Sequence, residues 1–88
     1  MKPSDLVSLW SGAACYDAPI DHHNAGDAIR HYVGMLDSGS VGVVLEVTTI
    51  AYADGTKSVG WCQILTGGRS AWVLGTNLRF ISSSDCRR

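Results

Sequence analysis

"WCQILTGGRSAWVLGTNLRFI", residues 61 to 81, holds two of the three tryptophans of the chain on either side of a Gly-Gly pair. Successive side chains of a strand point to opposite faces, and the apolar pattern predicts strands at 59–65 and 70–74. Gly67 and Gly68 suit the positive φ angles of a tight hairpin turn. The stretch therefore predicts that Trp61 and Trp72 lie on the two arms of one hairpin, where broad rings cover a small core.

Strand signals continue on both sides of this hairpin. The β-branched run 41–50 is the clearest of them, and an Asp-Gly pair at 54–55 predicts that the chain folds back before residue 59. The shorter apolar segments 5–10 and 77–82 predict a first and a closing strand. Five short strands joined by glycine-containing turns predict an all-β protein, a small five-stranded β-barrel that is closed or nearly closed, because closure removes exposed strand edges.

The segment 18–32 interrupts this series of strands. Its Pro19, Asn24 and Gly26 predict a long exposed first loop, with at most one helical turn near 28–32. Loops longer than about 12 residues in a compact domain are usually functional or disordered. We therefore expect a docking element here, which combines polar rim groups with apolar anchors. The residues concerned are His22, His23, Ile20, Ile29 and Tyr32.

Composition and charge narrow the class of protein. The 88 residues suffice for one small domain, which we place at 1–82 before a polar tail at 83–88. Seven basic and eight acidic side chains give a net charge of −1, without the basic excess of a nucleic-acid binder. The sequence shows neither an apolar run of the length that spans a membrane nor a secretion signal. We expect protein partners, with no nucleic acid and no membrane.

The three cysteines follow neither a paired nor a CxxC spacing, which predicts reduced thiols and no disulfide framework. Cys62 is predicted in the core and Cys86 in the tail. Nucleophilic catalysis requires a thiol of lowered pKa beside a histidine, and neither Cys15 nor Cys62 has a sequence context that indicates one. We expect no enzymatic activity and no cofactor.

A cluster of acidic residues and histidines allows two interpretations. Imidazole and carboxylate groups spaced by four residues share a helix face and can bind a metal ion. The other interpretation is a solvated loop, which the Pro, Asn and Gly of the same segment favour. We expect no metal site at these residues, which are Asp21, His22, His23, Asp27 and His31.

Aromatic residues provide a further candidate surface. Exposed aromatic rings give large contact areas at low entropy cost, so Tyr16, Tyr32, Tyr52 and Trp61 are candidates for a binding patch. Alternatively, these rings complete the core. For Trp72, which apolar neighbours flank, the core is the expected position.

The second half of the chain resembles a known family. Its pattern W-x-x-I-x-x-x-G-x-x-A-W-V-x-x-x-x-L is similar to the C-terminal half of bacterial SH3-like domains, which show W-x-V, a Gly hairpin, G-W-V and a final hydrophobic strand. The matching residues are Trp61, Ile64, Gly68, Ala71, Trp72, Val73 and Leu78. Upstream, "LDSGSVGVVLEV" at 36–47 resembles the family's L-x-x-G-x-x-V-x-V-L-x-V segment. The resemblance implies an SH3-like barrel over roughly residues 5–81.

The chain also departs from the family pattern. Ala71 stands where the family has a Gly, and Leu74 and Asn77 stand where eukaryotic SH3 ligand grooves have Pro and Tyr. Polyproline peptides bind to aromatic grooves of that kind. The resemblance therefore implies the fold of the family without its polyproline ligand, and small barrels serve many unrelated partners.

Two functions remain open at this stage. SH3-like proteins of this size resemble small structural proteins of tailed-bacteriophage virions, found at the head, the neck or the tail. That resemblance implies a non-enzymatic interaction module whose partners are other protein subunits, located in the virion or the host cytoplasm. The alternative is a peptidoglycan-binding module of the cell wall. Such modules usually carry an export signal, repeats or a hydrolase domain, so we expect the first function.

Overall fold

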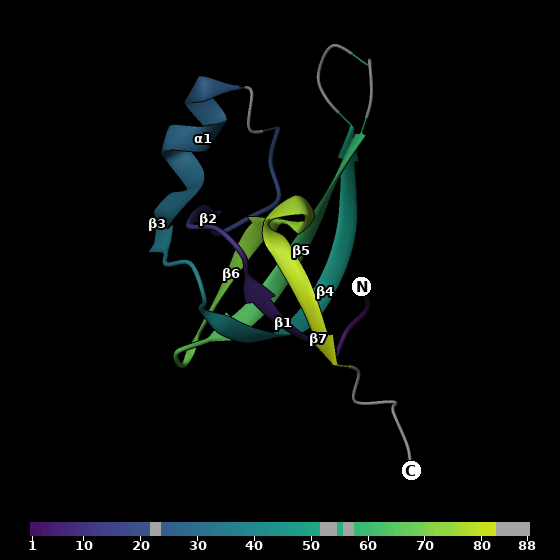
Figure 1. Cartoon of the computed structure of the whole chain (residues 1–88). Helices are drawn as coiled ribbons and strands as arrows, with labels where there is room; N and C mark the ends of the chain where they lie inside the picture. The colour runs from purple at the N-terminus through teal and green to yellow at the C-terminus, as the bar shows by residue number, and fades with distance from the viewer. Residues whose placement is uncertain (22–23, 52–54, 56–57, 83–88) are drawn as a thin grey trace.

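The computed structural model describes residues 1–21, 24–51, 55 and 58–82. Within them the chain forms seven strands, one α-helix and one 3-10 turn (Figure 1). In chain order these are β1 (Leu6–Leu9), β2 (Ala13–Tyr16), α1 (Ala25–His31), β3 (Tyr32–Leu36), β4 (Val41–Ala51), β5 (Ser58–Thr66), β6 (Arg69–Leu74), η1 (Gly75–Asn77) and β7 (Leu78–Ser82). The all-β prediction is confirmed, with one short helix added.

The strands form a single antiparallel sheet in the order β3-β2-β6-β5-β4-β1-β7. The sheet curls into a half-barrel, as Figure 1 shows. In the described part of the chain β3 and β7 are its two edges, so the sheet is open. We predicted a five-stranded barrel, closed or nearly closed; the described residues form seven strands, and their sheet has two edges.

Two strands that the sequence did not predict account for this difference. β2 contains two alanines and β3 contains Gly34, and Ala and Gly are depleted in strands. The two segments nevertheless pair with each other over their whole length, from Ala13 opposite Leu36 to Tyr16 opposite Tyr32. Pairing across the intervening helix supplies a strand context that the local sequence lacks.

The predicted hairpin is present as β5 and β6. Thr66 pairs with Arg69, and Gly67 and Gly68 between them have φ angles of 60° and 81°, as a two-residue hairpin turn requires. Trp61 lies opposite Leu74, while Trp72 lies opposite residue 63. Both tryptophans therefore project from the same face of the hairpin.

Buried side chains form two clusters on opposite faces of this hairpin. The larger fills the inside of the curl and contains Val7, Leu9, Ala13, Cys15, Val44, Cys62, Ile64, Ala71, Val73 and Leu78. The smaller lies on the other face and consists of Ile20, Trp61 and Trp72, with Tyr16 packed against it. Residues that alternate along β5 and β6 therefore enter different clusters, and the predicted core positions of Cys62 and Trp72 are confirmed.

Candidate functional site

Within the segment 18–32, predicted as a long first loop, residues 18–21 lie outside any helix or strand, whereas Ala25–His31 form the helix α1 and Tyr32 begins β3. α1 begins after Asn24, whose side-chain oxygen accepts a hydrogen bond from the backbone N–H of Asp27 at 3.1 Å. Such an N-cap satisfies a helix donor that otherwise has no partner. Arg30 forms an ion pair with Asp27 on the solvent side of the helix. We predicted at most one helical turn near 28–32; the helix is longer, Ala25–His31, because Asn24, taken as a sign of a loop, caps its start.

Asp17, which follows β2, makes two contacts with His31, the last residue of α1. The N–H of Asp17 donates to the carbonyl oxygen of His31 at 2.9 Å, and His31 Nδ1 lies 2.7 Å from Asp17 Oδ1. These contacts join the end of β2 to the beginning of β3. They fix the two neighbouring residues, Tyr16 and Tyr32, beside each other.

A β-bulge then turns Tyr32 toward the outer face of the sheet. β3 pairs Gly34 with Cys15 and Tyr32 with Tyr16, which leaves Val33 as an extra residue. Gly34 has a φ of 145°, a value that glycine tolerates and that L side chains disfavour. Simple alternation would direct Tyr32 to the same face as Gly34, toward the core. Bulges redirect side chains in this way, and here Tyr16 and Tyr32 share one face.

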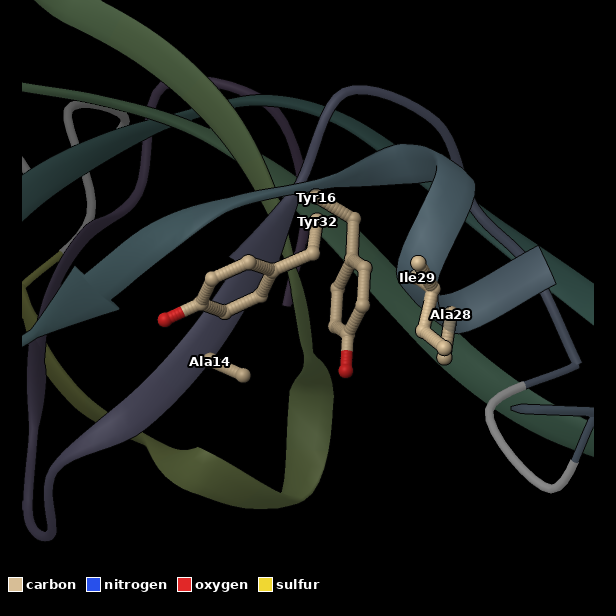
Figure 2. A pocket seen from close by; sticks show the side chains of 5 residues that line it. All are labelled: Ala14, Tyr16, Ala28, Ile29 and Tyr32. Carbon is tan, nitrogen blue, oxygen red and sulfur yellow. The ribbon is translucent and has the colours of Figure 1, made fainter. Parts of the chain in front are cut away.

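The two tyrosines line an apolar surface pocket of about 290 Å³ together with residues from β2 and α1 (Figure 2). Their rings meet edge to face, with centroids 6.1 Å apart and planes at 73°. Tyr32 is 48% exposed, and Ile29 on the helix is 80% exposed. We call this the pocket surface; its residues are Ala14, Tyr16, Ala28, Ile29 and Tyr32.

Trp61 supports the pocket surface from below. Its indole meets the ring of Tyr16 edge to face, with centroids 5.5 Å apart. Trp61 is 0% exposed and Ile20 is 6% exposed. Ile20 was expected as a contact residue, and Trp61 either as a contact residue or as part of the core. Both are core residues, because the segment that follows β2 covers this face of the hairpin and packs Ile20 against the two tryptophans.

The other candidate residues have different outcomes. Tyr16, Ile29 and Tyr32 are brought together at the pocket surface, whereas His22, His23 and Tyr52 lie outside the described residues. Ala14 and Ala28 were not predicted as site residues. They join the site through the unpredicted β2 and α1, and the signal available in the sequence was an N-cap Asn followed three residues later by an acidic side chain.

The two described cysteines have the surroundings of core groups. Burial raises the pKa of the Cys15 thiol, an effect that the positive charge of Arg69 partly opposes. Burial likewise raises the pKa of Cys62. Cys15 Sγ donates to the carbonyl oxygen of Gly34 at 3.2 Å. A raised pKa disfavours the thiolate, which is the nucleophilic form.

Two residues of the suggested metal cluster, Asp27 and His31, engage other partners, while His22 and His23 lie outside the described residues. Asp27 pairs with Arg30, and His31 contacts Asp17. Within residues 1–21, 24–51, 55 and 58–82, no group of three or more His, Cys, Asp or Glu side chains is placed to hold a metal ion. In the same part of the chain, no helix has the length and apolar character needed to cross a membrane.

The geometry offers an apolar hollow that two tyrosine rings line together with residues of β2 and α1. Surfaces of this composition suit contacts with other macromolecules. No protein-family model matches the chain, and searches of curated proteins and of solved structures likewise gave no match. Function is therefore inferred from the chemistry of the pocket surface.

Proposed function

We propose that the protein is a non-enzymatic interaction module that docks onto another protein subunit through the pocket surface. One observation carries the proposal: Ile29 is 80% exposed beside a pocket walled by two tyrosine rings. Exposed apolar patches with polar rims mark interaction sites, and buried aromatic anchors provide much of the binding energy at interfaces. The pocket is large enough to admit an apolar side chain of the partner.

The local structure holds this surface ready for binding. The cap at Asn24 fixes the start of α1, the Asp17–His31 contacts fix its end, and Trp61 supports the ring of Tyr16. A surface already ordered in the free protein loses less conformational entropy on association. Preorganisation of this kind favours a docking role for the pocket surface.

The assembly that the module joins is proposed from the sequence resemblance. We propose a small structural protein of a tailed-phage virion, at the head, the neck or the tail, whose curled sheet is an SH3-like barrel extended by β2 and β3. The glycine hairpin with Trp61 and Trp72 on one face supports this proposal. Its partners are then other virion subunits.

A second candidate function is peptidoglycan binding. The observation that favours it is Trp10, which is 56% exposed and whose indole Nε1 donates to the carbonyl oxygen of Thr76 at 2.8 Å. This hydrogen bond holds an aromatic face toward solvent, where a sugar ring can stack on it. The pocket surface lies on other elements, so the two functions predict different sensitive residues.

Ile29→Glu tests the docking proposal. Because Ile29 is a surface residue, the introduced carboxylate should leave the fold intact. It should prevent the pocket surface from packing against an apolar surface of the partner. Ile81→Glu is the matched control, since Ile81 is a 45% exposed isoleucine on β7. We expect the wild type and the control to co-sediment with high-mass assemblies from producing cells, and Ile29→Glu to remain in the supernatant. Equal co-sedimentation of both variants contradicts the proposal, and Trp10-dependent retention on purified cell wall supports peptidoglycan binding instead.

A further inference from the structure

β2, α1 and β3 form a unit that joins the rest of the sheet over a short length. β2 pairs with β3 along its whole length, but it pairs with β6 only where Tyr16 lies opposite Trp72. β3 is an edge strand of the described chain, and α1 has no buried residues. We call these three elements, with residues 17–21 and 24, the arm. In Figure 1 its helix and β3 lie to one side of the curled sheet.

The two chain segments that connect the arm to the sheet lie side by side. Leu9, at the end of β1, accepts a hydrogen bond from the N–H of Gly39 at 2.7 Å and donates one to the carbonyl oxygen of Ser40 at 2.9 Å. Both bonds lie outside the arm, so they can persist when the arm separates from β6. The arm therefore has a single base of attachment, next to the end of β1.

The arm contributes little apolar burial to the core. Its buried residues are Ala13, Cys15 and Ile20, of which only Ile20 is large. Apart from Cys15, the largest fully buried side chains lie on β1, β4, β5 and β6. Burial of apolar surface is the main favourable term in folding. Regions with few buried apolar contacts therefore open at a lower free energy than the whole domain.

We propose that the arm opens as one cooperative unit while β1 and β4 to β7 stay folded. Away from the hairpin, the arm has two paired strands and a helix of seven residues. A two-stranded hairpin is marginal in water, and so short a helix does not persist alone. The arm should therefore lose its order when it opens. The open state is the minor one, because the described structure has the arm closed.

Two side chains hold the arm closed. Ile20 packs against Trp61 and Trp72, and the ring of Tyr16 meets the indole of Trp61 with centroids 5.5 Å apart. Opening breaks both contacts. It leaves the β5–β6 pairs that position the two tryptophans. Opening therefore uncovers one face of a hairpin that itself remains folded.

Arm opening would also regulate the pocket surface, a consequence that rests on the proposed docking function. All the residues that line the pocket belong to the arm, and they come from three elements that meet only while the arm is folded. A partner that binds the closed state alone shifts the equilibrium toward that state. Docking and arm closure are therefore coupled.

Thiol labelling of the purified full chain tests the inference, because Cys15 lies on the arm and Cys62 on β5. Both thiols are buried, so each reacts with iodoacetamide only after the structure around it opens. A Cys86→Ser background removes the third thiol. Each rate, read by peptide mass spectrometry, is divided by the rate of the same cysteine in the urea-unfolded chain. We expect Cys15 to react at least about tenfold faster than Cys62 on this scale.

Two substitutions distinguish arm opening from global unfolding. In Gly42→Ala the added Cβ would lie 2.9 Å from the carbonyl oxygen of Leu65, and this strain between β4 and β5 remains while only the arm opens. The variant should accelerate labelling of Cys62 and leave that of Cys15 unchanged. Ile20→Ala weakens the closed arm relative to both the arm-open and the unfolded state. It should therefore accelerate labelling of both thiols.

The inference is overturned if the two wild-type thiols react at equal relative rates, or if Gly42→Ala accelerates both equally. Amide hydrogen exchange of the wild type is an independent measurement. The amides of β2 and β3 should share one opening free energy, lower than that of β4 and β5; equal values for all four strands overturn the inference.

These measurements use the chain alone and are separable from the docking test. Their failure leaves Ile29-dependent co-sedimentation, and with it the proposed function, intact. Co-sedimentation that ignores Ile29→Glu refutes the docking function, whereas faster labelling of Cys15 than of Cys62 would still support arm opening.

Discussion

The ring of Tyr16 meets the indole of Trp61 edge to face, with centroids 5.5 Å apart and planes at 84°. Tyr16 also pairs with Trp72 on β6 and with Tyr32 on β3. It is therefore the joint between the tryptophan hairpin and the unit that carries the pocket surface. Core packing and candidate binding site meet at this residue.

Replacement of Tyr16 tests this joint. Tyr16→Ala removes the ring that covers Trp61, and we expect it to lower the free energy of unfolding by about 2 to 4 kcal/mol and to shift tryptophan emission to longer wavelength. Tyr16→Phe keeps the ring and should cost less than about 1.5 kcal/mol. Equal losses for both variants, measured by urea unfolding, would assign the effect to the hydroxyl group instead.

Gly42 marks a close approach between β4 and β5. A Cβ at this position would lie 2.9 Å from the carbonyl oxygen of Leu65 and 3.2 Å from Cβ of Thr66. We expect Gly42→Ala to destabilise the fold by about 1 to 3 kcal/mol, the usual cost of overpacking. Gly60→Ala is the control, because nothing lies within 4 Å of its added Cβ. Thermal unfolding should separate the two variants; equal midpoints contradict the close approach.

Loss of the N-cap of α1 should destabilise the helix and leave the sheet little changed. Asn24→Ala removes the acceptor for the Asp27 N–H and should cost about 0.5 to 2 kcal/mol of helix stability. Because α1 has no buried residues, the loss should appear as faster amide hydrogen exchange over Ala28–His31, with the sheet amides little changed. Asn24→Ser keeps a capping oxygen and should exchange nearly as the wild type does. Uniformly faster exchange throughout the sheet would show that α1 supports the whole fold.

The buried thiols predict how stability depends on pH. Burial raises the pKa of Cys15 and Cys62 above the usual 9.0, so the folded state favours the protonated thiol. This contribution is fully present below the unfolded-state pKa and is lost as the pH rises through the folded-state values. Urea unfolding of wild type and Cys62→Ala should therefore show a smaller alkaline decline for the variant above pH 9.0. Parallel declines would mean that Cys62 ionises equally in both states.

The hairpin was predictable because all of its signals are local. Its apolar alternation and the Gly67-Gly68 turn lie within one short stretch. The strands at 41–51 and 78–82 were also predictable from the residues that they themselves contain. β2 and β3 were not predictable in this way. Their short, partly small-residue sequences become strands only because they pair with each other across α1.

Two β-bulges, at Leu45 in β4 and at Val33 in β3, were not predicted from the sequence. Val44 pairs with Ile64 and Glu46 with Gln63, so Leu45 is an extra residue of β4. Beyond this bulge, each side chain of β4 points to the face opposite to the one that regular alternation predicts. The bulge at Val33 has the same effect in β3. A one-residue shift of this kind reverses every later side chain of a strand. The pocket surface depends on such a shift at Val33: the sequence grouped Tyr16 and Tyr32 in one candidate patch, but regular alternation along β3 does not predict that they share a face.

The most direct test of docking through the pocket surface is photo-crosslinking in producing cells, with a photo-activatable amino acid at position 29 and, as the control, at position 81. Ile29 and Ile81 are both exposed but lie on α1 and β7 respectively. The account predicts discrete crosslinks to protein chains from position 29 and few or none from position 81. It is contradicted if position 29 yields no crosslinked protein while the protein is incorporated into its assembly.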